Sequence, residues 1–305
     1  MKRVGKTLKR FWPLYLMFLP GAIYLFINCY IPMFGIQIAF RQYNARDGIY
    51  GSPWCGLKNF EFLFRTNDAL IMIRNTLLYN LVFITLGTVL AVAVAIILNE
   101  IRSPKAKQLY QTVILIPYLI SMVIVSYLAF AFLSSSNGYI NNSLLAAFGA
   151  APIDWYNSPK YWPFILVIIN IWKGLGYNMI LYYATICGID HTLYEAAVVD
   201  GANRWQQIRN VTLPGLKSTI IILTLRAMGG IFRSDFGLFY QVPMNSGVLF
   251  PTTNVIDTYV YRALIEQGNI SMSSAAGVYQ SLVGFCVVML SNWIVRKVDK
   301  DQALF

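Results

Sequence analysis

Charged residues are scarce in this sequence. Only 12% of its 305 residues are charged, whereas 57% are hydrophobic, and the mean hydropathy is +0.55. A water-soluble domain carries roughly a quarter charged residues, so this chain lacks the polar surface that such a domain needs. We therefore expect a protein that lies within a membrane, as one domain over residues 1–305 with no separate soluble part.

Residues that bind metals or carry catalysis are also few. The sequence contains one histidine, His191, and its four cysteines have no C-x-x-C spacing, which argues against a metal centre and a disulfide framework. It has no G-x-x-x-x-G-K-[ST] phosphate loop, so nucleotide binding by that device is excluded. No nucleophile and base occur as a pair, which argues against an intramembrane enzyme. We expect no catalytic residue, metal or cofactor in this chain.

Long apolar runs, by contrast, are abundant. A helix that crosses the bilayer core needs about 20 apolar residues, and six segments reach that length. They lie at about 12–40, 76–98, 109–133, 162–184, 218–240 and 275–295. The third contains Pro117, which neighbouring helices can accommodate. The pattern predicts an all-α integral membrane protein, with short surface helices at 137–149 and 254–266 between the spans.

The distribution of basic residues predicts the orientation. Six spans place both termini on one side, and the segments on that side contain fourteen Lys and Arg against seven in the opposing loops. Basic loops remain in the cytoplasm, so both termini are expected there. The formal net charge of +11 then follows mainly from topology, and it gives no reason to expect nucleic acid as a partner.

The most specific pattern lies in the cytoplasmic connection at about 190–214. Thr192 and Glu195 have the T-x-x-E spacing of a capping box, which predicts the start of a helix. Gly201 can adopt the left-handed conformation that ends it. The two alanines that follow Glu195, Ala196 and Ala197, are small enough for another protein to approach the helix closely.

A second helix is expected in the same connection. Asn203 can cap it, and it is expected to run to about Asn210, before Leu213 and Pro214 break it ahead of the fifth span. The prediction is a helix, a glycine bend and another helix, held at the membrane surface.

This connection resembles the EAA loop of the permease subunits of binding-protein-dependent ABC importers. Glu195-Ala-Ala, three residues, Gly201, nine residues and Val211-x-Leu-Pro214 follow the spacing of that family, although Ile208 stands where relatives often have an aromatic residue. The resemblance implies a type I importer permease fold with a coupling helix that contacts an ATPase. It assigns ATPase contact or loop shape to Glu195, Ala196, Ala197, Asp200, Gly201, Leu213 and Pro214.

Further segments look like those of sugar-importing permeases, in particular the branch associated with complex oligosaccharides and polysaccharide fragments. They include Pro20-Gly-Ala-Ile-Tyr24, Gly56-Leu-Lys-Asn-Phe60 and Ile171-Trp-Lys-Gly-Leu-Gly176. The resemblance implies an oligosaccharide substrate, an extracellular binding protein and a homologous second permease in a heterodimer. It also implies two ATPase subunits that bind ATP and Mg, and a place among the lipids of the bacterial cytoplasmic membrane.

Three cations, Lys173, Arg226 and Arg233, lie inside the expected spans, where ionisable residues are costly and often functional. In an unbroken fifth span, residues 226, 230, 233 and 237 share one face, whereas Gly229-Gly230 can bend or break the helix. We expect a translocation cavity, and acidic or heavily hydroxylated sugars fit its cations. Its expected lining is Lys173, Tyr177, Asn178, Arg226, Arg233, Asp235, Phe236, Phe239 and Tyr240, with Asn80 as a secondary candidate.

Two alternatives remain open from the residues alone. The charges can pair with one another to stabilise helix packing, and the aromatic side chains can belong to the core or an interface. An ion-coupled secondary sugar carrier is also compatible with the apolar composition. It is the less favoured reading, because the first, second, third and sixth spans contain no acidic relay and the EAA loop would have no purpose.

Overall fold

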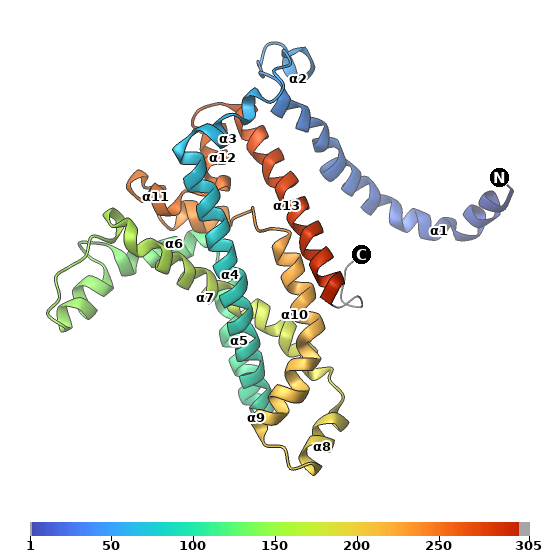
Figure 1. The fold of residues 1–305 in the computed structure, drawn as a ribbon, viewed down its shortest axis with the longest axis vertical. Helices are drawn as coiled ribbons and strands as arrows, with labels where there is room; N and C mark the ends of the chain where they lie inside the picture. Colours follow the sequence, from blue (N-terminus) through green and yellow to red (C-terminus); the bar gives the residue numbers. More distant parts are fainter. Residues whose placement is uncertain (1, 299–305) are drawn as a thin grey trace. The chain divides into compact units, whose positions relative to one another are not determined.

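The computed structural model describes residues 2–298 of the chain, with the side chains of residues 11–297, and these residues are almost entirely helical (Figure 1). In this part of the chain there is no β-strand, only one isolated bridge between Arg41 and Trp54. Within residues 2–298, five helical segments are long and apolar enough to cross a membrane, or six if one bent pair counts as a single span. The predicted all-α membrane class is confirmed.

The chain divides into two compact units. The first comprises the N-terminal residues up to Arg65 together with Val260–Tyr279, and the second comprises Thr66–Tyr259 together with the residues from Gln280 on. The expectation of one membrane domain, like the cytoplasmic position of the termini, stays a prediction.

In the first unit, an apolar helical run covers the first predicted span. It consists of α1 (Lys2–Leu25), a π-helical turn (Phe26–Tyr30) and a 3-10 segment (Ile31–Phe40), followed by α2 (Gly48–Gly51) and α3 (Phe62–Arg65). The residues after it fold back on the run, because Asn59 donates its amide to the carbonyls of Ala39 and Arg41, each at 2.9 Å.

The second unit contains the remaining helices. They are α4 (Asn67–Glu100), α5 (Pro104–Leu119), α6 (Met122–Leu133), α7 (Trp162–Cys187), α8 (His191–Val199), α9 (Arg204–Gln207), α10 (Leu213–Met228) and α11 (Phe250–Thr253). Two more, α12 (Ile256–Ile265) and α13 (Ile270–Val298), contribute residues to both units. The two predicted surface helices are present, one as α12 and the other as a π-helical turn (Ile140–Leu145) before Gly149.

Small residues let α4, α5 and α7 pack closely. Ala91 and Ala95 of α4 are fully buried in a cluster with Met179 and Tyr182 of α7. Against α5, a Cβ added at Gly176 of α7 would lie 2.8 Å from the Cα of Leu115. Close packing of this kind is the main source of helix association in lipid, where burial gives no hydrophobic gain.

The third predicted span, at about 109–133, is bent. The helix α5 ends at Leu119, and α6 begins at Met122 at an angle of 94° to it. Pro117 lacks an N–H, and Ser121 starts a new helix by accepting a hydrogen bond from the Ile124 N–H at 3.4 Å. The span is therefore broken three residues after the proline, at Ile120.

The carbonyl groups at this break are satisfied by Lys173 of α7. Its ammonium donates to the carbonyls of Tyr118 at 3.0 Å, Pro117 at 3.5 Å and Ile120. A cation at the C-terminal end of a helix also interacts favourably with the helix dipole. Lys173 thus supplies a donor to the carbonyl groups at the break, of which that of Pro117 also accepts from the Ile120 N–H at 3.3 Å.

We expect Gly176→Ala to destabilise the second unit. Overpacking of this type costs about 1–3 kcal/mol, because the new methyl group meets the backbone of α5. Gly174→Ala in the same helix is the matched control, since its Cβ would meet only Asn178 Nδ2 at 3.8 Å; alanine there should be neutral or stabilising by up to about 1 kcal/mol. Thermal unfolding in detergent compares the two, and equal midpoints would contradict this account of the packing.

Candidate functional site

The predicted 190–214 connection forms a pair of short helices, and its first helix starts at a residue that the motif did not indicate. The Asp190 carboxylate accepts a hydrogen bond from the Thr192 N–H at 2.9 Å and is the N-cap of α8. The predicted Thr192–Glu195 capping box is therefore wrong: Asp190 is already in the cap position, and Thr192 lies within the helix. This hydrogen bond favours the ionised carboxylate and lowers the pKa of Asp190.

Both predicted signals around the bend are confirmed. Gly201 has φ +78°, the left-handed conformation that glycine adopts readily, and the Ala202 N–H returns to the Ala197 carbonyl at 2.9 Å. Asn203 and Gln206 then form a reciprocal capping box at the start of α9.

Pro214 does not break the second helix. The helical run continues from Arg204 through a π-helical turn (Ile208–Thr212) into α10 and ends at Met228. Pro214 lies in the first turn of α10. The wider π turn accommodates the missing N–H of the proline, so α9 and α10 form one continuous path from the connection into the fifth span.

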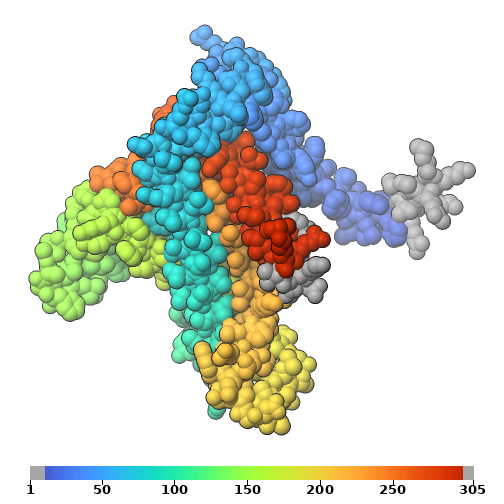
Figure 2. Space-filling view, in the orientation of Figure 1, coloured from blue at the N-terminus to red at the C-terminus, as the bar shows by residue number. Residues whose placement is uncertain are grey.

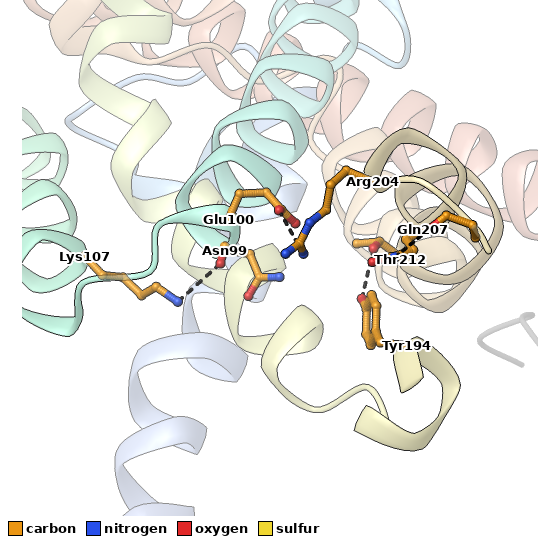
Figure 3. Close-up of polar contacts among 8 residues, drawn as sticks. Asn99, Glu100, Lys107, Tyr194, Arg204, Gln207 and Thr212 are labelled. Carbon is orange, nitrogen blue, oxygen red and sulfur yellow. Dashed lines mark hydrogen bonds and ion pairs between the residues drawn. The ribbon is translucent and has the colours of Figure 1, made fainter. Parts of the chain in front are cut away.

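Side-chain contacts fix this connection to the neighbouring helices (Figure 3). Arg204 pairs with Glu100 at the end of α4, with 3.3 Å between Nη1 and Oε2. The hydroxyl groups of Tyr194 in α8 and Thr212 lie 2.9 Å apart. These contacts hold α8 and α9 against the ends of α4 and α10.

The outer surface of the pair is available to another protein. In α8, Leu193, Val198 and Val199 are exposed by 53, 59 and 86%, and Trp205 in α9 by 70%. In the face drawn in Figure 2, this segment (yellow) stands free at one end of the second unit. Glu195 is also exposed, with its carboxylate 3.6 Å from His191 Nδ1.

A groove of about 1080 Å³ lies beside α8. It is lined by Glu195 and Val198 of α8, by Glu100 and Arg204, and by Lys107 of α5 among others. Of the predicted coupling residues, Glu195, Ala196 and Ala197 lie on α8. Asp200 and Gly201 directly follow it, and Leu213 and Pro214 lie at the start of α10.

The fifth span is interrupted, as the alternative at Gly229-Gly230 allowed. The helix α10 ends at Met228, and the helical path resumes only with the π-helical turn Gly237–Gln241. The prediction that residues 226, 230, 233 and 237 share one helical face is therefore wrong, because such a face needs a continuous helix. A Cβ at Gly229 would lie 3.1 Å from Val288 Cγ2, so this end of α10 is packed closely on α13.

Three polar side chains from other helices hold the interrupted segment. Of these only the first, Asn80, was a candidate from the sequence, and there it was a secondary candidate for the cavity lining. Asn80 of α4 donates to the carbonyls of Ile231 and Arg233, each at 2.9 Å. Gln280 of α13 and Asp257 of α12 contact the same segment. Gln280 is a polar residue within the sixth apolar run, and this position was the sequence signal that could have indicated a contact with the interrupted segment.

The charged and aromatic residues predicted to line a cavity differ from one another in their exposure to solvent. Arg226, Arg233 and Asp235 are exposed. Asp235 accepts a hydrogen bond from the Leu238 N–H at 3.1 Å. Phe239 is only 2% exposed, and its ring centroid lies 4.9 Å from that of Tyr79. Phe239 thus belongs to the hydrophobic core in this structure, and its contact with a substrate stays a prediction.

The remaining aromatic candidates form stacked pairs. Phe236 stacks on Tyr240 at 4.8 Å between ring centroids, and Tyr177 stacks on Tyr118 at 4.9 Å. Tyr177 and Asn178 are exposed. Contact of these residues with a substrate stays a prediction.

Comparison with known proteins identifies the family. Residues 85–300 match the family described as the binding-protein-dependent transport system inner membrane component. The chain belongs to this family. The resemblance found in the EAA loop is thus confirmed, and the chain is a permease, a transport subunit rather than an enzyme.

Relatives of this permease extend over almost its whole length. It is 37% identical to a polygalacturonan/rhamnogalacturonan transport system permease of Bacillus subtilis, over 94% of this chain and 89% of the relative. It is 33% identical to the LplB protein of the same organism, over 97% and 92%.

Solved structures agree with the predicted type I fold. A chain of a bacterial ABC transporter that imports the acidic polysaccharide alginate matches with a TM-score of 0.89 and 34% identity, over 97% of this permease and 99% of that chain. A second structure of a bacterial alginate transporter, in complex with an alginate pentasaccharide-bound periplasmic protein, matches with a TM-score of 0.88 and 34% identity, over 98% and 99%.

We expect Asp190→Ala to loosen the first turn of α8, because it removes the acceptor of the Thr192 N–H. Asp190→Asn retains a side-chain oxygen that can accept this hydrogen bond and serves as the control. Hydrogen exchange of the α8 amides should be faster in Asp190→Ala and close to wild type in Asp190→Asn. Unchanged exchange in Asp190→Ala would show that the cap does not determine the start of the helix.

Proposed function

We propose that this permease is one transmembrane subunit of an ATP-driven importer and forms half of the translocation pathway for an oligosaccharide. The observation that carries the proposal is the exposed helix α8, which the Tyr194–Thr212 contact fixes to the start of α10. The Glu100–Arg204 pair fixes the adjoining α9 to the end of α4. A helix held in this way can transmit the movement of an ATPase to the spans.

Coupling through α8 requires a surface that an ATPase can bind. Leu193, Val198 and Val199 give α8 an exposed apolar surface, and the centre of a protein–protein interface is typically apolar within a polar rim. Glu195 adds an exposed charge beside them. ATP and Mg then bind to the partner ATPase subunits, of which the importer contains two.

The proposed substrate is an oligosaccharide that an extracellular binding protein delivers. The names of the relatives support this class, because they mention polygalacturonan, rhamnogalacturonan and alginate. The second half of the pathway comes from a homologous permease chain. The assembly lies in the cytoplasmic membrane of a bacterium, with both termini of this chain in the cytoplasm.

We expect Glu195→Lys to weaken ATPase association, because it reverses an exposed charge at the proposed contact. A loss of about tenfold in affinity corresponds to roughly 1.4 kcal/mol. Co-purification from cells that express the whole importer measures the ATPase recovered per permease.

Glu61→Lys is the matched control, since Glu61 is an exposed glutamate outside the coupling connection. It should recover as much ATPase as the wild type. Full recovery with Glu195→Lys would contradict coupling through this surface.

A further inference from the structure

The interrupted part of the fifth span, Gly229–Ser234, depends on side chains from three other helices. Asn80 Nδ2 of α4 donates to the carbonyls of Ile231 and Arg233. Gln280 Nε2 of α13 donates to the carbonyl of Phe232 at 2.9 Å. Successive carbonyl groups of a non-helical segment are thus all satisfied. We call Asn80, Asp257 and Gln280 the clamp.

The third member of the clamp is acidic. Asp257 Oδ2 accepts hydrogen bonds from the Ser234 N–H at 2.7 Å and from Gln280 Nε2 at 3.1 Å. Burial raises the pKa of Asp257, whereas these two hydrogen bonds and the nearby Arg233 charge act in the opposite direction. Asp257 therefore joins the clamp into one connected network.

The clamp places neighbouring residues on opposite sides of the segment. Ile231 and Phe232 are each 7% exposed, as is Gln280. Arg233, the next residue, is exposed. The carbonyl groups of Phe232 and Arg233 are both held by hydrogen bonds, which fixes the direction of the backbone at Arg233. Its side chain therefore projects out of the second unit.

Among the residues that the structure describes, none forms a hydrogen bond or an ion pair with the Arg233 guanidinium. A guanidinium is always charged, and exposure of such a group to hydrocarbon is costly. Arg233 therefore requires water, an anion or a partner chain opposite it. Its planar fork matches the two oxygens of a carboxylate better than an ammonium does.

We propose that the clamp is a positioning device that presents Arg233 to the carboxylate groups of an acidic oligosaccharide in the translocation pathway. This inference rests on the proposed function and specifies its substrate class. Asn80, Asp257 and Gln280 are positioning residues that act through Arg233. A neutral sugar of the same length gains nothing from the guanidinium, so the permease itself discriminates by charge.

The test uses the assembled importer in proteoliposomes with its binding protein. The probes are a galacturonate oligomer and the same oligomer with methyl-esterified carboxyl groups. The measurement is the ratio of ATPase stimulation by the acid to stimulation by the ester. All variants share one binding protein, so its own preference cancels when their ratios are compared.

Arg233→Gln should lower this ratio about tenfold, because it removes the charged partner of the carboxylate groups; tenfold corresponds to roughly 1.4 kcal/mol. Arg233→Lys keeps the charge but loses the fork, and its ratio should lie between those of Arg233→Gln and the wild type. An unchanged ratio in both variants would overturn the proposal and would indicate that Arg233 faces a partner chain or lipid headgroups.

Asn80→Ala tests the clamp itself and should lower the ratio in the same direction, by about three- to tenfold, since it frees the carbonyls on both sides of Phe232. Asn75→Ala is the matched control: Asn75 lies on the same helix and donates to the backbone at Pro251 and Asn254 instead. It should lower stability without changing the ratio. Equal ratios in the two alanine variants would overturn the positioning role.

The outcomes separate this inference from the proposed function. If neither sugar stimulates the wild-type importer, the proposed oligosaccharide function fails. If both sugars stimulate it and the ratio is the same in every variant, only the role of Arg233 and the clamp fails.

Discussion

Every backbone N–H and C=O inside a bilayer must find its partner within the protein, because lipid offers none. A continuous helix meets this requirement by itself, but an interrupted one does not. The third and fifth spans of this permease are both interrupted, one at Ile120 and one after Met228. Three polar residues of the apolar helices, Lys173, Asn80 and Gln280, are explained by this requirement, since each of them donates to carbonyl groups at one of the two breaks.

The two breaks are compensated in different ways. At the third span a single cation, Lys173, gathers the carbonyl groups at the end of α5. At the fifth span, two amide side chains donate to carbonyl groups and one carboxylate accepts from a backbone N–H. These three residues join α4, α12 and α13 around the segment. The fifth break also lies at the end of the run Arg204–Met228. One helical path therefore connects the proposed ATPase contact with the proposed sugar contact.

Local patterns predicted most of the elements. Apolar runs indicated the spans, and Gly201 and Asn203 indicated the two helices of the coupling connection, because turn and cap preferences depend on neighbouring residues. The partners at the breaks could not be predicted this way. Asn80 contacts carbonyl groups more than 150 residues along the chain. A lysine, an asparagine or a glutamine in an apolar run indicates a need for partners, but only the fold specifies which ones.

ATP-dependent uptake tests the central claim most directly. The permease is reconstituted in liposomes with its second permease, its ATPase subunits and its binding protein, and labelled galacturonate oligomer is supplied outside. The account predicts accumulation that requires both internal ATP and the binding protein. Accumulation driven by a sodium or proton gradient, without ATP, would contradict it and would identify an ion-coupled carrier.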